Sequence, residues 1–358
     1  MAVHFHSLKI KQVKNETPDC VSVSFDVPEN IAPEFLYKEG QNITLKAILN
    51  GEEVRRSYSL CTAPHENEIK VAIKLVDGGI FSSYAQQLKK GDVLEILPPV
   101  GKFNAKLREV KGNYLAIAAG SGITPVISII KHTLQTQPQS SFTLIYGNKS
   151  RSSIIFFEEL EAIKNRYMER FNFMNILSRE KTDAPINYGR INGDKLNDLQ
   201  PLIDFKTFDS AYICGPEEMI FSSAAFLENN GLDKSSIHFE LFTTPGQTFT
   251  KKQSSAAVAE KDSGPKSSIS IKLDGRSFDF NLSQGGQSIL DAALQQGADL
   301  PYACKGGVCC TCRAKLVSGQ VSMDVNYALE PEEVEAGFIL TCQSHPRSEK
   351  VVVDFDVK

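Results

Sequence analysis

Five cysteines near the end of the chain have the spacing of metal ligands. Cys304, Cys309, Cys310 and Cys312 fall within nine positions of the stretch YACKGGVCCTCRAK, and Cys342 follows in ILTCQSH. Without Cys310 the spacing is C-x4-C-x2-C, with 29 residues between Cys312 and Cys342. Four thiolates at these intervals suit two irons bridged by two sulfides, because one loop wrapped around the cluster supplies three of its ligands.

The residues around this motif favour a [2Fe–2S] cluster over the alternatives. Gly306 and Gly307 lack a Cβ, so their backbone can approach the cluster and direct N–H groups at its sulfur atoms. A zinc ribbon would need two C-x2-C pairs, and the sequence contains a single such pair. The side chains of adjacent residues diverge, so we expect Cys310 to bind no iron and either to pack beside the loop or to lie half-exposed.

The composition is typical of a globular protein with more than one domain. The chain has 358 residues, of which 41% are hydrophobic and 23% charged, and this length exceeds one ordinary core. A net charge of −4 gives no basic surface for nucleic acid, and no apolar run approaches the roughly 20 residues that span a bilayer. The first residues lack the apolar core of a signal peptide. We therefore expect a cytoplasmic protein with reduced thiols and no membrane partner.

Two segments of different character precede the cysteines. Residues 1–106 contain short alternating runs such as QNITLKAIL, with turn dipeptides at Asn50–Gly51 and Gly78–Gly79, which predicts an antiparallel β-barrel or sandwich. Residues 107–242 alternate apolar strands such as YLAIAA with helical segments such as VISIIKHTLQ. This alternation predicts an α/β domain with a doubly wound parallel sheet.

The last part of the chain begins with a change in composition. Residues 243–268 are small and polar, which predicts a flexible linker, and a long ordered loop is the alternative. Residues 269–358 contain a hairpin that turns at Asp274–Gly275 and a helix that starts at Ser288 and stops near Gly297. We expect a small sheet with one main helix across it, which is an α+β fold.

The cysteine motif is similar to that of plant-type ferredoxins, and the segments before it resemble the ferredoxin–NADP reductase family. The resemblance covers nearly the whole chain and implies an FAD-binding barrel, a nicotinamide-nucleotide domain and a β-grasp ferredoxin domain, in that order. The domain order and the sequence motif CKGGVCCTC resemble in particular those of the reductase subunits of phenylacetyl-CoA epoxidase complexes. Reductases of other aromatic-ring and steroid hydroxylases share this layout. The cluster ligands it implies are Cys304, Cys309, Cys312 and Cys342.

The motif RSYSL, residues 56–60, carries the flavin site that the resemblance implies. It places Arg56 on the FAD pyrophosphate, Tyr58 against the isoalloxazine ring and Ser59 near N5, with Ser57 beside them. A guanidinium forks onto phosphate oxygens, and an aromatic ring stacks on the flavin plane. Because alternate residues of a strand face opposite sides, Ser59 must act through its backbone unless the strand twists. An ordinary half-exposed strand is the alternative for this motif taken alone.

The motif GGIFSS, residues 78–83, is expected to begin a helix. The first N–H groups of a helix can receive a phosphate, here the second phosphate of FAD. A plain turn with a helix cap is the alternative. The residues concerned are Gly79, Ile80, Phe81 and Ser82, and Ser82 is expected to help receive the phosphate together with those N–H groups.

The motif AGSGITP, residues 119–125, follows an apolar strand and precedes a helix. Gly120 and Gly122 allow a pyrophosphate to approach the helix N-terminus, and Thr124 lies in the same loop. The motif differs from the G-x-G-x-x-G fingerprint because a threonine and a proline occupy its last positions.

The next strand ends in IYGNKSRSSI, which bears on the choice of nucleotide. An acidic residue often binds the ribose hydroxyls of NAD at such a position, and this stretch has none. Lys149 and Arg151 supply positive charge that suits a 2′-phosphate. We expect NADPH to be preferred over NADH; the alternative is that both side chains are simply solvated.

Two further motifs complete the site for hydride transfer. In ICGPEEM, residues 213–219, the resemblance places Cys214 beside C4 of the nicotinamide, with Gly215 and Pro216 shaping the floor. A positioning role is expected there, and a cysteine buried in the core is the alternative. In HFELF, Glu240 and Phe242 are expected near the flavin, with core packing as the alternative. The catalytic candidates are Tyr58, Ser59, Cys214 and Glu240.

Together these parts predict an electron-transfer reductase. A nicotinamide delivers two electrons as a hydride, an iron–sulfur cluster accepts one at a time, and a flavin can do both. The sequence has no Glu-x-x-His to suggest a di-iron site, so the oxygen chemistry is expected on a separate oxygenase component. A free-standing reductase and a zinc-stabilised binding module are the alternatives. The acidic stretch MDVNYALEPEEVEAG suits either a docking face or a solvated helix.

Overall fold

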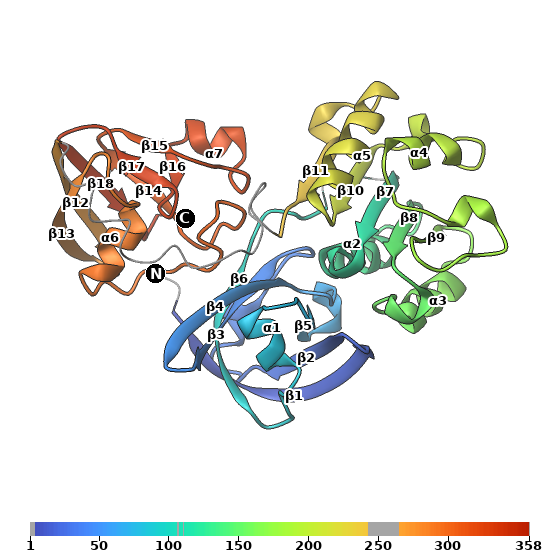
Figure 1. Ribbon diagram of the computed structural model, residues 1–358, viewed down its shortest axis with the longest axis horizontal. Coiled ribbons are helices and arrows are strands. Elements are labelled where there is room, and N and C mark those ends of the chain that lie inside the picture. The colour runs from blue at the N-terminus through green and yellow to red at the C-terminus, as the bar shows by residue number, and fades with distance from the viewer. Residues whose placement is uncertain (1–3, 106, 110, 243–264, 358) are drawn as a thin grey trace. The chain divides into compact units, whose positions relative to one another are not determined.

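The computed structural model describes residues 4–105, 107–109, 111–242 and 265–357, which divide into two compact units (Figure 1). The reductase unit comprises residues 7–54 and 58–242. The ferredoxin unit is built on residues 265–357 and includes residues 4–6 and 55–57. Each unit is described separately below.

The reductase unit begins with an antiparallel barrel, as the alternating sequence predicts. Its six strands follow the order β4-β3-β6-β1-β2-β5, and a bridge between Leu60 and Val71 joins the two ends of the sheet. Asn50 and Gly51 both have positive φ and turn the chain between β3 and β4. The elements are β1 (His6–Thr17), β2 (Cys20–Asp26), β3 (Asn42–Leu49), β4 (Glu52–Ser59), β5 (Ile69–Lys74), β6 (Val93–Val100) and the helix α1 (Ile80–Ala85).

Strand β2 is buried on both faces, which explains how the barrel joins the next domain. Val21 and Val23 belong to the barrel core, whereas Cys20 packs in the core of the nucleotide-binding domain together with Ala72 of β5. The small residues that alternate with valine in this stretch therefore face a second protein layer. The two domains consequently form one unit.

The nucleotide-binding domain has the parallel, doubly wound sheet that the sequence predicts. Its strand order is β11-β10-β7-β8-β9, and the adjacent pairs are parallel. Helices α2 and α3 cover one face and α4 and α5 the other (Figure 1), as right-handed crossovers require. The elements are β7 (Asn113–Ala119), α2 (Ile123–Thr136), β8 (Ser141–Asn148), α3 (Phe157–Arg166), β9 (Phe171–Leu177), α4 (Gly193–Leu199), β10 (Ser210–Cys214), α5 (Glu217–Asn229) and β11 (Ile237–Glu240).

Helix α2 also fastens the nucleotide-binding domain to the barrel. The hydroxyl of Ser128 donates to the carbonyl of Thr62 at 2.6 Å and accepts from the backbone N–H of Gly40 at 3.3 Å. One turn on, the ammonium of Lys131 lies 2.7 Å from Glu66 and 2.8 Å from the α3 residue Glu159, with 8% of the lysine side chain exposed. A buried cation between two carboxylates therefore links three segments of this unit.

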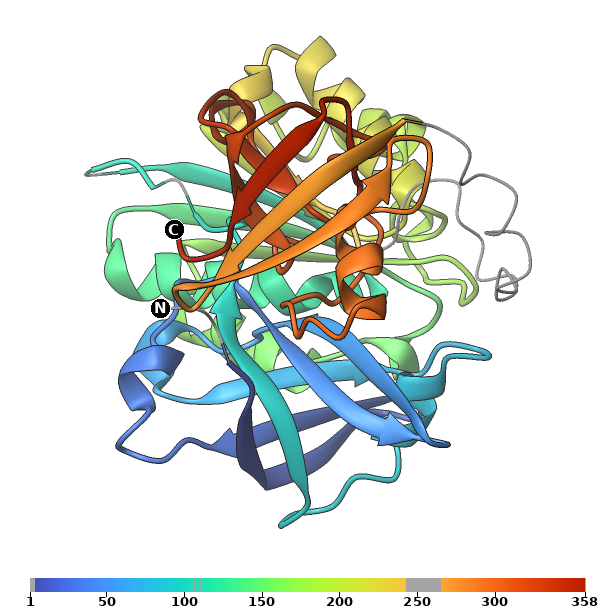
Figure 2. The ribbon, with the colours of Figure 1, turned by 90° about the vertical axis from the view of Figure 1, so that its left-hand side faces the viewer.

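The ferredoxin unit has a five-stranded mixed sheet with the α+β character expected of a β-grasp domain. The strand order is β13-β12-β18-β14-β16, and β12 and β18 run parallel. Helix α6 lies across one face of this sheet (Figure 2), where Ile289 and Leu290 join its core. The elements are β12 (Lys266–Leu273), β13 (Arg276–Ser283), α6 (Ile289–Gln295), β14 (Arg313–Ser318), β15 (Val321–Met323), α7 (Pro331–Glu335), β16 (Phe338–Leu340), β17 (Ser344–Pro346) and β18 (Lys350–Asp354).

The predicted hairpin turn and helix start of this unit are found, and one predicted boundary is corrected. Asp274 and Gly275 have positive φ between β12 and β13, and the Ser288 hydroxyl accepts from the N–H of Asp291 at the start of α6. The predicted linker end at residue 268 is wrong, because β12 begins at Lys266. Ser267 is buried and donates to the carbonyl of Ser348, so a small polar residue here serves the sheet. The rest of the predicted linker, residues 243–264, lies outside the described residues.

Among the described residues, no helix is long and apolar enough to span a bilayer.

Candidate active site and metal centre

Strand β4 carries the predicted flavin motif, and exposure decreases along it from Arg56 to Ser59. Arg56 is exposed, Ser57 and Tyr58 are half-buried, and Ser59 is buried. One guanidinium nitrogen of Arg56 donates to the carbonyl of Arg55 at 2.7 Å, which leaves other donors of the fork for a phosphate. The phenol ring of Tyr58 is half-accessible, so one of its faces can meet a planar ring system.

The second flavin motif forms the short helix α1 after a glycine turn. Gly78 has φ +71°, Gly79 precedes the helix, and Ile80 is 49% exposed at its start. Phe81 is 1% exposed, and its ring lies 5.8 Å from that of Tyr58, so the barrel core holds the tyrosine from behind. The two predicted flavin motifs therefore meet in the structure.

The structure gives Ser82 a different role from the one that the sequence suggests. Its hydroxyl is buried, accepts from the N–H of Val76 at 3.1 Å and lies 3.1 Å from the carbonyl of Gly79, to which it can donate. The hydroxyl therefore closes the turn before α1. The backbone N–H groups at the start of α1 are the donors that would remain for a phosphate at this loop.

Three of the four catalytic candidates are brought together where β10 and β11 end. Cys214 and Glu240 are register partners on these parallel strands. The hydroxyl of Ser59 donates to Glu240 Oε2 at 3.1 Å, across 181 positions of sequence. Tyr58, the fourth candidate, is the neighbour of Ser59 on β4. The side chain of Ser59 thus acts directly on Glu240, which strand alternation did not predict.

Cys214 sits in a buried environment that keeps its thiol neutral. The side chain is fully buried, and burial raises the pKa of Cys214 well above its usual range, with a further contribution from the charge of Glu240. A neutral thiol is a poor nucleophile. The geometry therefore suits contact and positioning rather than covalent catalysis.

The glycine loop after β7 lies against the end of β10, at the point where the strand order reverses. A Cβ on Gly122 would come within 2.1 Å of the Cys214 carbonyl oxygen, and one on Gly215 within 3.2 Å of Ala119. Gly120 has φ +53°. These glycines allow the two strand ends to touch, at the switch point where open α/β sheets bind ligands.

The loop is further fixed by side chains on either side of it. The Thr124 hydroxyl donates to the carbonyl of Ser121 at 3.0 Å, and Pro216 precedes the first residue of α5. Both predicted residues therefore shape the crevice through the backbone.

Two residues that sequence reasoning missed also meet the glycine loop. The buried hydroxyl of Tyr146 on β8 donates to the carbonyl of Gly120 at 2.8 Å. The ammonium of Lys74, at the end of β5, lies 3.8 Å from the position of a Cβ on Gly120 and 3.5 Å from the Asp19 carboxylate. Lys74 thus brings a cation from the barrel to a loop suited to phosphates. Little in the sequence indicated this role for Lys74, because a lysine at the end of a strand is usually solvated.

The predicted basic residues follow β8, the second strand of the parallel sheet. Lys149 and Arg151 are both exposed, and the guanidinium of Arg151 lies 4.9 Å from the ring centre of Phe157. The structure adds an acid, because Glu180 accepts from the backbone N–H of Arg151 at 2.9 Å. Sequence patterns did not indicate this neighbour, since it follows a different strand.

The four predicted cluster ligands form two pairs in the ferredoxin unit. The thiol of Cys309 lies 3.1 Å from the sulfur of Cys304, and Cys312 is hydrogen-bonded to Cys342. The hydrogen bond from Cys309 lowers the pKa of Cys304 to about 7, and that from Cys312 lowers the pKa of Cys342. The same hydrogen bonds raise the pKa of the donors Cys309 and Cys312 well above the usual range, so each pair holds one more acidic and one less acidic thiol. As cluster ligands all four would be thiolates.

The arrangement in two pairs suits a cluster in which two irons share the thiolates. A [2Fe–2S] cluster takes four thiolates shared between two irons. The N–H of Gly306 points at Cys304 Sγ at 3.3 Å, and Gly307 has φ +74°. The cradle thus has the close backbone that the sequence predicts.

Cys310 stands apart from both pairs. Its thiol donates to the carbonyl of Ala328 at 3.1 Å, and the residue is half-buried. This sulfur therefore faces a neighbouring loop.

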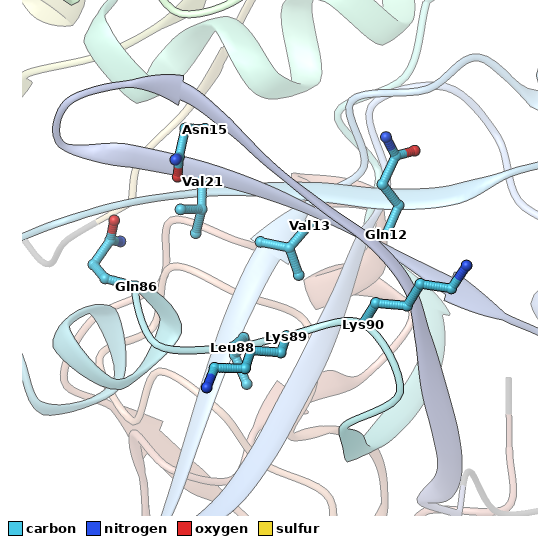
Figure 3. A pocket seen from close by; sticks show the side chains of 8 residues that line it. All are labelled: Gln12, Val13, Asn15, Val21, Gln86, Leu88, Lys89 and Lys90. Carbon is cyan, nitrogen blue, oxygen red and sulfur yellow. The ribbon is translucent and has the colours of Figure 1, made fainter.

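A hollow on the barrel surface lies away from these residues. It has a volume of about 480 Å³ and lies between β1 and the segment after α1 (Figure 3). None of the predicted site residues lines it. Its lining residues are Gln12, Val13, Asn15, Val21, Gln86, Leu88, Lys89 and Lys90.

Comparison with known proteins gives matches along almost the whole chain. Residues 7–105 match the oxidoreductase FAD-binding domain family, residues 116–224 the oxidoreductase NAD-binding domain family, and residues 271–347 the 2Fe-2S iron-sulfur cluster binding domain family. A component of the 1,2-phenylacetyl-CoA epoxidase of Escherichia coli K12 is 46% identical over 357 residues, which is 99% of this chain and 98% of that protein.

More distant relatives share the same layout. The ferredoxin reductase component of 3-ketosteroid-9-alpha-monooxygenase from Rhodococcus rhodochrous is 31% identical, with 97% of this chain and 96% of that protein covered. The solved structure of phthalate dioxygenase reductase superposes with a TM-score of 0.59 at 23% identity and covers 98% of both chains. At this identity the likeness establishes the fold.

Proposed function

Because this chain belongs to the flavoprotein reductases that carry a C-terminal [2Fe–2S] domain, we propose that it serves a phenylacetyl-CoA-epoxidising oxygenase. Its family is of the ferredoxin–NADP reductase type and comprises the reductase components of multicomponent oxygenases. Electrons would pass from NADPH to FAD, then to the [2Fe–2S] cluster, and from there to the oxygenase. The choice of partner is carried by the 46% identity, over nearly the whole chain, with the E. coli epoxidase component.

The residues of the reductase unit support this path by binding and orientation. FAD, when bound, supplies the step from an electron pair to single electrons. Tyr58 offers a ring face for the flavin, and Cys214 offers a neutral thiol against the nicotinamide. The hydrogen bond between Ser59 and Glu240 holds a proton at the serine oxygen and fixes the carboxylate beside Cys214. Each group acts without changing its covalent state.

The preferred nucleotide is proposed to be NADPH. Lys149 and Arg151 are exposed at the end of β8, where a doubly wound sheet receives the ribose of the nucleotide. Glu180 is held by the backbone N–H of Arg151, which partly offsets its charge. Two cations against one hydrogen-bonded carboxylate favour a 2′-phosphate.

Steady-state rates with NADPH and NADH test this preference. We expect Arg151→Gln to lower kcat/KM for NADPH about tenfold and to change the value for NADH little, whereas Glu180→Gln should raise the NADPH value. Lys206→Gln, which changes an exposed lysine on a different loop, is the control. Equal or NADH-favouring values in the unmodified protein would overturn the proposal.

The partner is tested by reconstitution with purified oxygenase components. Oxygen uptake driven by NADPH should require this chain, the oxygenase components of the epoxidase and phenylacetyl-CoA together. A ring- or steroid-hydroxylating oxygenase with its own substrate is the second arm, motivated by the 31% identical steroid monooxygenase component. Coupling in that arm alone would move the assignment to the second candidate. Substrate-independent oxidation of NADPH, unaffected by either oxygenase, would indicate a free-standing reductase.

A further inference from the structure

The residue that follows the fourth cysteine ligand reaches back to the loop that carries the first. The side-chain amide nitrogen of Gln343 lies 3.0 Å from the carbonyl oxygen of Lys305 and 3.1 Å from that of Cys342. The same nitrogen lies 3.7 Å from the Sγ atom of Cys342. Gln343 thus joins two segments that are 38 positions apart and that supply different ligands.

The backbone of Gln343 is itself fixed. Its N–H donates to the carbonyl of Leu340 at 2.9 Å, and its carbonyl accepts from the N–H of Asp324 at 2.9 Å. Its side-chain stem packs against the cradle, since a Cβ on Gly307 would lie 3.3 Å from Gln343 Cγ. A side chain anchored in this way can hold a partner in place.

The partner, Lys305, occupies a conformation that needs support. Its φ is +51°, which is uncommon for a residue with a side chain. Its ammonium pairs with Asp291 at 2.7 Å and lies 4.6 Å from the centre of the Tyr302 ring. Both ends of this residue are therefore held, the side chain by Asp291 and the carbonyl by Gln343.

The carbonyl of Lys305 and the N–H of Gly306 belong to one peptide group. Because that group is planar and trans, its oxygen and its hydrogen point in opposite directions. Fixing the oxygen on Gln343 therefore fixes the direction of the N–H, which donates to Cys304 Sγ at 3.3 Å. The side-chain amide of Gln343 thereby sets the direction of the N–H that donates to Cys304, and it also lies close to the sulfur of Cys342.

We propose that Gln343 is a positioning residue that raises the reduction potential of the cluster. It orients the Gly306 N–H toward Cys304 and presents its own amide to Cys342. Donors aimed at ligand sulfur stabilise the extra negative charge of the reduced cluster. A higher potential favours transfer of an electron from the flavin. The inference rests on the function proposed above and concerns the residues, not the identity of the oxygenase.

The test is a redox titration of the purified full chain, followed by the visible and EPR signals of the cluster. Gln343→Met keeps the length of the side chain and removes the donor. We expect the one-electron equilibrium to shift about threefold to tenfold toward the oxidised cluster, which corresponds to a fall of about 28 to 59 mV. Gln343→Glu, which replaces the donor with a carboxylate, should lower the potential further.

Two further variants separate hydrogen bonding from packing. Gln343→Lys restores a donor on a long side chain and should return the potential to the original value or above it. Gln284→Met is the matched control, because Gln284 is also half-buried in this unit and its amide donates to Ser267. The control should leave the potential unchanged.

Several outcomes would overturn the proposal. They are an unchanged potential in Gln343→Met, equal falls in the Met and Lys variants, or an equal fall in the control. If the Met variant fails to retain the cluster, the Glu variant decides, and a potential equal to that of the unmodified protein would reject the role. A failed oxygenase assay with these potential shifts intact would instead reject the proposed partner.

Discussion

The four paired cysteines differ from Cys310 in what their sulfur atoms face. Cys304 lies against Cys309, and Cys312 against Cys342, whereas Cys310 donates to a backbone carbonyl of a neighbouring loop. The chain bends at Cys309 and Cys310, and their sulfur atoms have different partners, Cys304 for the first and the Ala328 carbonyl for the second. Two adjacent cysteines are therefore expected to differ, with Cys309 as a ligand and Cys310 as a non-ligand.

We expect Cys310→Ser to retain the visible absorbance of the cluster and Cys309→Ser to lose most of it. Serine can still donate to the carbonyl of Ala328, so the first change costs at most about 1 kcal/mol of stability. The second removes a thiolate that has no replacement in the cradle. Absorbance spectra and iron content of the two purified variants check this. Loss of iron in Cys310→Ser would contradict the assignment of ligands.

Cys214→Ala should lower kcat for NADPH oxidation about tenfold to a hundredfold and leave the flavin spectrum unchanged. A misplaced reactant typically costs this much when the chemistry is intact. Burial raises the pKa of Cys214 well above its usual range, so the thiol stays protonated where an exposed thiol would ionise. The kcat profile of the unmodified protein should therefore show no inflection that the variant lacks. A thiol-dependent inflection between about pH 6 and 9 would indicate a titrating cysteine.

At the scale of elements, helix α2 has two roles that depend on the same short segment. Its first turn follows the glycine loop, and its outer face binds the barrel through Ser128 and Lys131. Lys131 is buried with two carboxylates, so the charges compensate one another only while all three segments are together. The position of the nucleotide loop is thereby coupled to the barrel.

Lys131→Met should destabilise the reductase unit by about 3 kcal/mol, because it leaves Glu66 and Glu159 close together without their cation. For a unit of this size we expect the thermal midpoint to fall by roughly 6 to 12 °C. Flavin release during heating gives the measurement. Lys11→Met, which breaks the more exposed pair with Glu68, is the control and should change the midpoint little. Similar falls in both variants would argue against a special role of the buried site.

At the scale of the whole molecule, the two units carry different parts of the electron path. The reductase unit holds the residues expected at hydride transfer, and the ferredoxin unit holds the four paired cysteines. The reductase unit has two hydrophobic cores, and the ferredoxin unit has a separate core on its own five-stranded sheet. A change confined to one unit should therefore leave the chemistry of the other intact.

Cys342→Ser provides this test in the full chain. Reduction of ferricyanide by NADPH, which needs the flavin, should stay within about twofold of the original rate. Oxygen uptake coupled to the oxygenase should fall more than about a hundredfold, because no cluster remains to pass single electrons. Retention of the coupled reaction would show that the flavin reduces the oxygenase directly.

Much of the fold follows from local sequence patterns. Alternation with a period of two marked the barrel strands, and apolar strands followed by helices marked the parallel sheet, because side-chain direction along a strand or helix depends on local geometry alone. Asp274–Gly275 and Ser288 are found at the turn and the helix start that the sequence predicts. The linker end was misplaced because Lys266 and Ser267 have the composition of a loop.

By itself the sequence determined the strand types, the order of the domains and the set of paired thiols, since these depend on spacing along the chain. Only the tertiary structure decided which distant groups meet: Ser59 with Glu240, Lys74 with Gly120, and Gln343 with Lys305. Such contacts depend on how strands and loops far apart in sequence are placed in space. Local patterns carry no record of that placement, because a side chain has the same preferences whichever neighbour the fold brings to it.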